Sequence, residues 1–473
     1  MAKGNATLFD GRNAYGYLEH LAVEIGPRLT GSAGEHKAAR YIEKVFKSFG
    51  LKTRLQKYPS ITFDNRKTDF EVLDRGKWRS VQCQPIMMTK STPARGIEGE
   101  IYFAENGAPE YFSPAMKDKI VMVCGGIGPD NRPKFLAHKP KALVIIEGGL
   151  SEEPIRVNMG EHNRKTYGNL PMARIRHLDG LDVIKKGLKR ARLTMQITEK
   201  KSHCFNVIGE KTGTDFPDEI IVVCGHYDTS MGISGASDNA GGTSLVMELA
   251  RIFASEPTKR TLRFIAFSGE ETGLNGSTFY ANDLARKAER EKKKKTFREK
   301  LDKTELDRHV FTFNIDVHGF ILGSNSATFN GSDDIGASVR LLAKEIARPC
   351  GVSKGPMSSD GTPLAAVGIP NVQFARNGGT GSYLHSSLDD IRNLSPEGLA
   401  VSGEFAELYL RRYVTQAAAF PFPRDIPDDQ MKGVKDYFKG GKRPVPGEKE
   451  EEKDKGKPKK KAGKKKGKRA TRK

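Results

Sequence analysis

The segment from Cys224 to Asn282 decides the fold, and its sequence is CGHYDTSMGISGASDNAGGTSLVMELARIFASEPTKRTLRFIAFSGEETGLNGSTFYAND. The apolar run Ile220 to Cys224 predicts a buried strand, and His226 and Asp228 follow it directly. A loop rich in glycine and serine then carries Asp238, after which apolar residues at helical spacing predict a helix. A histidine therefore stands at the end of a predicted strand, and a carboxylate stands at the start of the next helix.

The same arrangement recurs further along the chain. The run from Thr261 to Phe267 predicts a second strand, and the adjacent acids Glu270 and Glu271 come soon after it. The run from Phe311 to Ile315 predicts a third strand, which ends at Asp316. In open α/β sheets, ligands bind beyond the carboxyl ends of the strands, so these side chains are candidates for one site.

Side chains of types that bind zinc stand at these strand ends or in nearby loops. His385 completes the set, because it closes a glycine-rich loop after the short apolar run Val372 to Ala375. The candidates are His226, Asp238, Glu271, Asp316 and His385. Imidazole and carboxylate donors suit zinc, and a bridging carboxylate would let this set hold two ions.

Short segments of the chain resemble, in order and spacing, the signature segments of a known enzyme family. They are GHYDT, SGASDNAGG, SGEETGLNGS, NIDVHG and YLHSSLDD. The family is that of the dinuclear zinc aminopeptidases, with bacterial leucyl aminopeptidase, glutamate carboxypeptidase and the transferrin receptor among its relatives. The resemblance implies an α/β fold with a mixed, mainly parallel central sheet flanked by helices. It also implies a metallo-aminopeptidase that acts on peptides with a free N-terminus.

The resemblance further assigns the metal ligands. His226 and Asp316 would bind one zinc ion, and Glu271 and His385 would bind the other. Asp238 would bridge the two ions, and cobalt or manganese could exchange with zinc.

Catalytic roles follow from the same resemblance. Glu270, next to a ligand, would act as the general base that takes a proton from water and passes it to the leaving amine. Asp228 would accept the second ring N–H of His226 and so fix its orientation. Tyr383 would lie near the oxyanion, and the peptide at Asp238 is expected to be strained.

Some residues near the signature segments carry no assigned chemistry. Gly361 stands where the family usually has histidine, so we expect no substrate contact to be assigned to its loop. His309 and His318 match no ligand position, which favours structural or solvent-exposed roles. Arg28 lies in the loop GPRLTGS between two predicted helices, and we expect it to have no direct chemical role.

Composition divides the chain into four predicted parts. Residues 1–84 hold the leading helices and first strand, and residues 85–195 form an inserted β-rich module that resembles the protease-associated domain. Residues 196–420 form the zinc peptidase core. Residues 421–473 are predicted to be a linker and a disordered, Lys-rich tail, because they have almost nothing to bury. The inserted module carries no ligand cluster, so gating of substrate access or a purely structural role is expected for it.

Helical spacing and charge predict further elements outside the signature segments. The predicted helices cover residues 14–25, 33–49, 181–189 and 396–413. Residues 284–309 are highly charged and predict a solvated helix or helix pair that stands off the core. The strands on either side of this charged stretch are expected to be neighbours.

Charge and cysteine usage bear on the compartment and on partners. The net charge is +21, and residues 439–473 contribute more than half of it. The N-terminus lacks the apolar region of a secretory signal, no run is long enough to suggest a membrane span, and the five cysteines are widely spaced. We expect a cytoplasmic protein with free thiols. The tail would attract acidic surfaces weakly, without a specific nucleic-acid module.

Other functions remain open at this point. A carboxypeptidase or dipeptidase of the same family would need an arginine cluster at the cleft, and only Arg376 lies near a signature segment. A mono-zinc glutaminyl cyclase would not need His226 and Asp316 together. A receptor or scaffold on the same fold would be expected to have lost ligand residues, and none is lost here.

Overall fold

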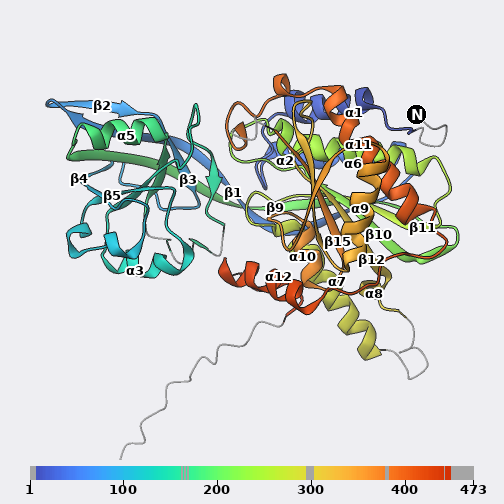
Figure 1. Ribbon diagram of the computed structural model, residues 1–473. Coiled ribbons are helices and arrows are strands. Elements are labelled where there is room, and N and C mark those ends of the chain that lie inside the picture. The colour runs from blue at the N-terminus through green and yellow to red at the C-terminus, as the bar shows by residue number, and fades with distance from the viewer. Residues whose placement is uncertain are drawn as a thin grey trace, which may run out of the picture.

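The computed structural model describes residues 7–160, 163–164, 167, 170–294, 303–378, 383–441 and 443–448. Within these residues, a mixed sheet with helices on both faces lies beside a smaller part that is rich in strands (Figure 1). Two long strands, β1 (Lys52–Asp74) and β9 (Arg190–Lys211), pair with each other along most of their length and run through both parts.

The central sheet confirms the predicted fold class. Its strands run in the order β14, β13, β15, β12, β10, β11, β9. Their bounds are β10 Phe216–His226, β11 Arg260–Phe267, β12 His309–Ile315, β13 Ser324–Asn330, β14 Cys350–Lys354 and β15 Asn371–Asn377. Strand β10 is parallel to β11 and to β12, and β12 is parallel to β15, whereas β9 and β13 run antiparallel to their neighbours β11 and β15. The expectation that β11 and β12 are neighbours is wrong, because β10 lies between them.

Helices cover both faces of this sheet (Figure 1). One face packs on the main apolar core together with α1 (Gly11–Glu19), α2 (Ala33–Ser48), α6 (Gly242–Ala254), α9 (Asp333–Glu345) and α11 (Pro396–Tyr409). The other face packs with α7 (Asn275–Lys294) and with α10 (Gly361–Ala366). The helices predicted over 14–25, 33–49 and 396–413 are confirmed; the first and last continue as wider helical turns at His20–Ile25 and Leu410–Thr415.

The smaller part contributes strands that continue the sheet from β9 through β4, and it has two apolar cores. Its strands are β2 (Lys77–Val81), β3 (Cys83–Met87), β4 (Ile97–Phe103), β5 (Ile120–Cys124), β6 (Ala142–Ile146), β7 (Val157–Asn158) and β8 (Met172–Ile175). Its helices include α3 (Arg132–Ala137) and α5 (His177–Lys185), the latter near the helix predicted over 181–189. Phe70 and Val72 of β1 pack in one of these cores. By packing, the smaller part therefore includes residues that precede the boundary expected after residue 84.

The charged stretch at 284–309 forms the end of α7 and the short α8 (Glu305–Arg308), with residues 295–302 outside the described part. Helix α7 nevertheless buries Tyr280, Leu284 and Ala288, so its first turns belong to the core. All five cysteines are free, as predicted. Among the residues that the structure describes, every helix is too short or too polar to cross a membrane. The cytoplasmic location stays a prediction.

The expectation of a linker from residue 421 is wrong for residues 428–440, which form α12 (Asp428–Gly440). Val434 and Phe438 of this helix are buried with Ile426 and Val445 in a small apolar core on α10. They recur at helical spacing along the helix, which accounts for its formation. The Lys-rich residues from 449 onward lie outside the described residues, so the predicted disorder and surface binding of the tail stay predictions.

Candidate metal centre

The topology brings the predicted ligands to one edge of the sheet. In the parallel register, His226 at the end of β10 lies beside Phe267 at the end of β11. On the other side of β10, strand β12 ends at Ile315, directly before Asp316. The carboxyl ends of these strands therefore lie together, and α6 begins a few residues after Asp238.

Three of the candidates form a first group, His226, Asp238 and Asp316, and all three are buried. The Nε2 atom of His226 lies 3.2 Å from Asp238 Oδ1 and 3.2 Å from Asp316 Oδ1. Donor atoms at 2.0–2.2 Å from a tetrahedral zinc lie about 3.3 Å from each other. These spacings therefore fit a zinc ion.

A second group consists of Asp238, Glu271 and His385. The Nε2 atom of His385 lies 3.2 Å from Asp238 Oδ2 and 3.3 Å from Glu271 Oε2. Asp238 thus presents one carboxylate oxygen to each group. All five residues predicted from the sequence are brought together, and the donor chemistry and spacing fit two zinc ions that share one carboxylate.

The carboxylate of Asp228 contacts the ring of His226, as predicted, and also contacts other residues next to the two groups. His226 Nδ1 is 3.5 Å from Asp228 Oδ1 and 3.2 Å from the backbone carbonyl of the same residue. The backbone N–H groups of Glu270 and Glu271 point at its two oxygens, at 3.2 and 3.4 Å, and the Thr30 hydroxyl donates to Oδ2 at 2.9 Å. Asp228 therefore ties the loop after β11 to the end of β10.

The loop that carries Asp238 is fixed from two sides. Asn239 donates from Nδ2 to the Ile315 carbonyl at 3.0 Å and accepts at Oδ1 from Val317 N–H at 3.2 Å. Asp389 Oδ2 accepts from Asp238 N–H at 3.1 Å. The peptide bond between Asp238 and Asn239 is cis.

Two residues that support the candidate ligands had no role predicted from the sequence. The carboxylate of Asp389 also accepts from the backbone and hydroxyl of Ser237, at 2.8 and 2.6 Å. Ser230 donates from its hydroxyl to Glu271 Oε2 at 2.8 Å and from its backbone to Oε1 at 3.1 Å. Asp389 lies within the segment YLHSSLDD and Ser230 follows GHYDT, so closeness to the signature segments was the available signal.

Arg28 is fully buried and positions the backbone, in agreement with the absence of a predicted chemical role. Its guanidinium donates to the carbonyls of Tyr227, Ser234 and Gly235, at 2.7 to 3.0 Å. Gly235 has φ +52°, and a Cβ there would lie 2.4 Å from the Asp238 carbonyl oxygen. The turn before Asp238 therefore needs glycine.

His309 and His318 are buried and lie outside both groups, so the structural role predicted for them fits their contacts. His309 contacts Arg263 and Tyr280, and Nε2 of His318 lies 3.0 Å from the Phe374 carbonyl.

The remaining loop residues lie close to the first group without joining it. Ser359 donates from its hydroxyl to Asp316 Oδ2 at 2.5 Å and accepts from Asn314 Nδ2 at 2.7 Å. Asp360 is buried beside it, and burial raises the pKa of its carboxyl to about 7. Tyr383, expected near the oxyanion, is not among the described residues that line the pocket.

Burial and neighbouring charges shift the pKa values of the ionisable side chains in and next to the two groups. Burial disfavours the charged imidazole, yet Asp316 and the neighbouring carboxylates outweigh it and raise the pKa of His226 well above its ordinary value. Glu271 raises the pKa of His385 to about 10. Burial, reinforced by neighbouring acids, raises the pKa of Glu270 well above that of an ordinary carboxyl. Several carboxylates are buried together here, and burying unpaired charge costs free energy. The site therefore favours the binding of cations.

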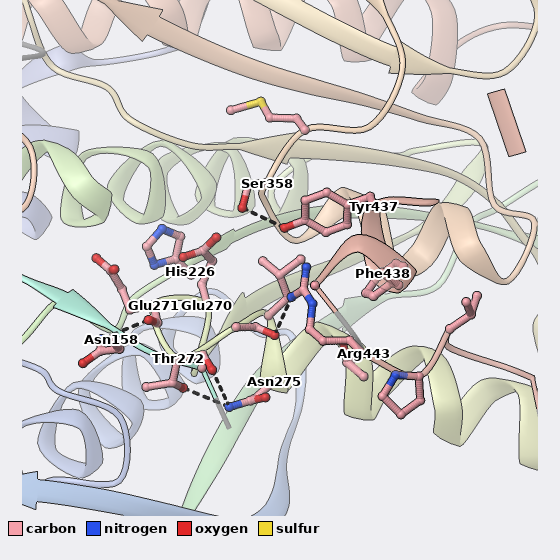
Figure 2. Close-up of a pocket in the computed structure, with 18 of the residues that line it drawn as sticks. Asn158, His226, Glu270, Glu271, Thr272, Asn275, Ser358, Tyr437, Phe438 and Arg443 are labelled. Atoms are coloured by element: carbon pink, nitrogen blue, oxygen red, sulfur yellow. Dashed lines mark hydrogen bonds between the residues drawn. The ribbon is translucent and has the colours of Figure 1, made fainter. Parts of the chain in front are cut away.

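A cavity of about 1040 Å³ opens over both groups. His226, Glu270 and Glu271 lie on one side of it, and Tyr437, Phe438 and Arg443 lie opposite (Figure 2). The opposite wall belongs to the C-terminal segment that the sequence predicted to be a linker. Tyr437 shares a hydrogen bond of 2.7 Å with Ser358, and Arg443 donates to the Gly273 carbonyl at 3.1 Å.

Residues 206–410 match the family model described as Peptidase family M28. This part of the chain is therefore similar to peptidase family M28. The match agrees with the family that the signature segments predicted, and together with the aminopeptidase relatives it supports a peptide hydrolase.

Individual relatives agree with this match. It is 28% identical to the aminopeptidase YwaD of Bacillus subtilis over 411 residues, which cover 84% of this chain and 83% of the relative. A probable zinc metalloprotease of Pyrenophora tritici-repentis is 41% identical over 87 residues, 17% of this chain and 18% of the relative. The structure of BSAP, a zinc aminopeptidase from Bacillus subtilis, superposes with a TM-score of 0.67 at 25% identity and covers 89% of this chain and 99% of its own. These likenesses and the donor set support zinc as the metal of this chain.

Proposed function

We propose that the protein is a zinc aminopeptidase that removes residues from the free N-terminus of peptides and holds two zinc ions. The observation that carries the proposal is the sharing of Asp238 between two groups of donors, each spaced for a zinc ion. His226 and Asp316 complete one subsite, and Glu271 and His385 complete the other.

Zinc, when bound, supplies Lewis acidity and lowers the pKa of water toward neutrality. The chain's own residues do the rest. Glu270 lines the cavity next to both groups and takes a proton from the water that attacks the peptide carbonyl carbon. As the C–N bond breaks, the Glu270 carboxyl returns that proton to the nitrogen of the leaving amine.

Orientation of these groups is the work of residues behind them. The carboxylate of Asp228 contacts the ring Nδ1 of His226 and accepts a hydrogen bond from the backbone N–H of Glu270. Ser230 holds both carboxylate oxygens of Glu271. A ligand whose orientation is fixed in advance needs less ordering when the metal binds.

Two alternatives lose support from the geometry. A carboxypeptidase or dipeptidase would need an arginine cluster at the cleft, but Arg376, which lies near a signature segment, donates to the carbonyls of Phe320 and Ile321 and has a structural role. Arg286 and Arg443 line the cavity, but Glu289 and Glu448 line it too, so its charge does not favour acidic substrates. A receptor on a dead peptidase fold would not be expected to keep every donor in place.

Hydrolysis of paired peptides tests the proposal. One peptide has a free N-terminus, its partner has the same sequence with an acetylated N-terminus, and a third has a free N-terminus and an amidated C-terminus. We expect the enzyme to shorten the first and third from the N-terminus, seen by mass spectrometry, and to leave the acetylated one intact. Cleavage of the acetylated peptide, or release of C-terminal residues, would refute aminopeptidase activity.

A further inference from the structure

A segment of the inserted module, Glu153 to Asn158, contacts the backbone of two residues in the second group. The N–H of Arg156 donates to the carbonyl of His385 at 2.8 Å. The side-chain Nδ2 of Asn158 donates to the carbonyl of Glu271 at 2.9 Å, as Figure 2 shows for the side chain of Asn158 beside Glu271. The segment therefore holds both residues that, with Asp238, make up that group.

Glu153 adds a third contact to the same loop. Its carboxylate accepts from the backbone N–H of Ser387, two residues after His385. The same carboxylate pairs with Arg156 at 2.7 Å, and both side chains are mostly buried, with 13% and 15% exposed. Hydrogen bonds to a charged group in such a setting are among the stronger ones in proteins.

Residues 153–158 are also bound firmly to the rest of the inserted module. A movement of the module would therefore move the backbone of the proposed ligands Glu271 and His385. Strand β7 pairs with β3 through Val157 and Asn158. The N–H of Ile155 donates to Glu147 Oε1 at 3.2 Å, and Arg174 holds the two oxygens of Glu147 at 2.7 and 2.6 Å. Residues 153–158 therefore connect the sheet of the module to the loops that carry Glu271 and His385.

The first group is supported differently. Asp316 is held by Ser359, and His226 by Asp228, all from the central sheet and its loops. Within the described residues, the hydrogen bonds and ion pairs of His226 and Asp316 involve no residue of the inserted module. One subsite is built by the core alone, whereas the other needs two parts of the chain.

We propose that Glu153 and Asn158 are positioning residues of the second zinc subsite, so that docking of the inserted module sets the affinity for one of the two ions. This inference rests on the proposed two-zinc function. Groups that orient metal ligands typically change metal affinity by about 10- to 100-fold when they are removed. We expect an effect of this size on one ion and little effect on the other.

The test compares the zinc-loaded enzyme with Glu153→Ala, Asn158→Ala and the double variant. Zinc is removed by stepwise addition of a chromogenic chelator. The zinc that stays bound per chain after dialysis is measured by elemental mass spectrometry. Wild type should release two ions in turn. The variants should release one ion at about 10- to 100-fold lower chelator concentration and the second ion as in wild type.

Matched variants separate positioning from general damage. Glu153→Gln keeps an acceptor for Ser387 N–H and should restore much of the affinity. Asp182→Asn removes the ion pair with Arg79 elsewhere on the module, at 2.7 Å, and should release zinc as wild type does. Thermal melting of every variant shows whether the fold is intact.

The outcomes are distinguishable from a failure of the proposed function. If wild-type protein never binds two ions, the two-zinc proposal itself fails. If wild type binds two ions and the variants release both as wild type does, or lose both together, the positioning role is refuted.

Discussion

The backbone N–H of Glu270 donates to Asp228 Oδ1 at 3.2 Å. The same carboxylate lies 3.5 Å from the ring Nδ1 of His226, so one buried side chain orients a proposed metal ligand and the proposed general base. The two residues come from the ends of different strands, β10 and β11, which are parallel neighbours. The position of the proposed base relative to the proposed metal subsites is therefore set by the register of the sheet.

The first prediction concerns Glu270→Gln. A glutamine cannot take the proton from water, so kcat should fall by about 10²- to 10⁴-fold. Because Glu270 belongs to neither donor group, zinc content should stay at the wild-type value. Steady-state hydrolysis of an amino-acid p-nitroanilide, with zinc counted on the same sample, checks both. Wild-type turnover in this variant would rule out the proton-transfer role.

The second prediction compares Asp238→Ala with His385→Ala. Asp238 belongs to both donor groups, so its loss should weaken both ions. His385 belongs to one group, so its loss should leave one ion bound with near wild-type affinity. Zinc counting after dialysis distinguishes the two variants. Equal zinc contents in both would speak against a shared carboxylate.

The third prediction concerns stability and pH through Glu35. Burial raises the pKa of this carboxyl from 4.5 to about 7, and Tyr227 donates to it. The folded state therefore binds more protons than the unfolded state between these values. The stability that Glu35 contributes is complete below pH 4.5 and is lost as the pH rises through about 7.

Glu35→Gln stays neutral and keeps an acceptor for Tyr227. Its free energy of unfolding at pH 8 should exceed that of wild type by at most about 3 kcal/mol, and the gain should shrink toward pH 5. Urea unfolding at both pH values measures the difference. As a control, Glu407→Gln removes a buried carboxylate that pairs with Arg411 at 2.7 Å and should destabilise the protein at both. A pH-independent effect of Glu35→Gln would contradict the assignment.

The fourth prediction concerns the C-terminal segment. Removal of residues 449–473 should leave turnover and melting temperature unchanged, because this Lys-rich segment has almost no apolar side chains to bury. A cut after Pro427 removes α12 with Val434 and Phe438 and opens the cavity, so both should fall. Calorimetry and p-nitroanilide hydrolysis test both truncations.

The point variant Phe438→Ala isolates the packing contribution of α12. Loss of this buried ring should lower the free energy of unfolding by about 3–5 kcal/mol. A cut after Pro427 that left activity and stability intact would show that the segment is a linker after all.

Part of the proposed ligand set was predictable because His226, Glu271 and Asp316 lie at or after the ends of strands whose apolar runs are visible locally. His226 and Asp316 each stand next to such a run, and the parallel arrangement of the strands brings them together. The contact of Asn158 with Glu271 was not predictable in this way. It joins residues 113 positions apart, and the strand that carries Asn158 has only two residues, too few for a periodic signal.

Helix α12 shows a second limit of sequence reasoning. Its apolar positions are few among charged residues, and a proline-rich stretch precedes it, so composition favoured a linker. Packing on α10 decides the outcome, because Val434 and Phe438 find a buried partner surface there. That surface is formed by residues far away in the sequence.

The central claim is that five side chains hold two zinc ions and that hydrolysis depends on them. The most direct measurement counts zinc per chain during stepwise removal by a chelator and stepwise return, with leucine p-nitroanilide hydrolysis recorded at each step. The account predicts two zinc ions per active chain, loss of activity on removal, and its return with added zinc. Full activity in protein freed of metal, or a purified active enzyme that binds no zinc, would contradict it.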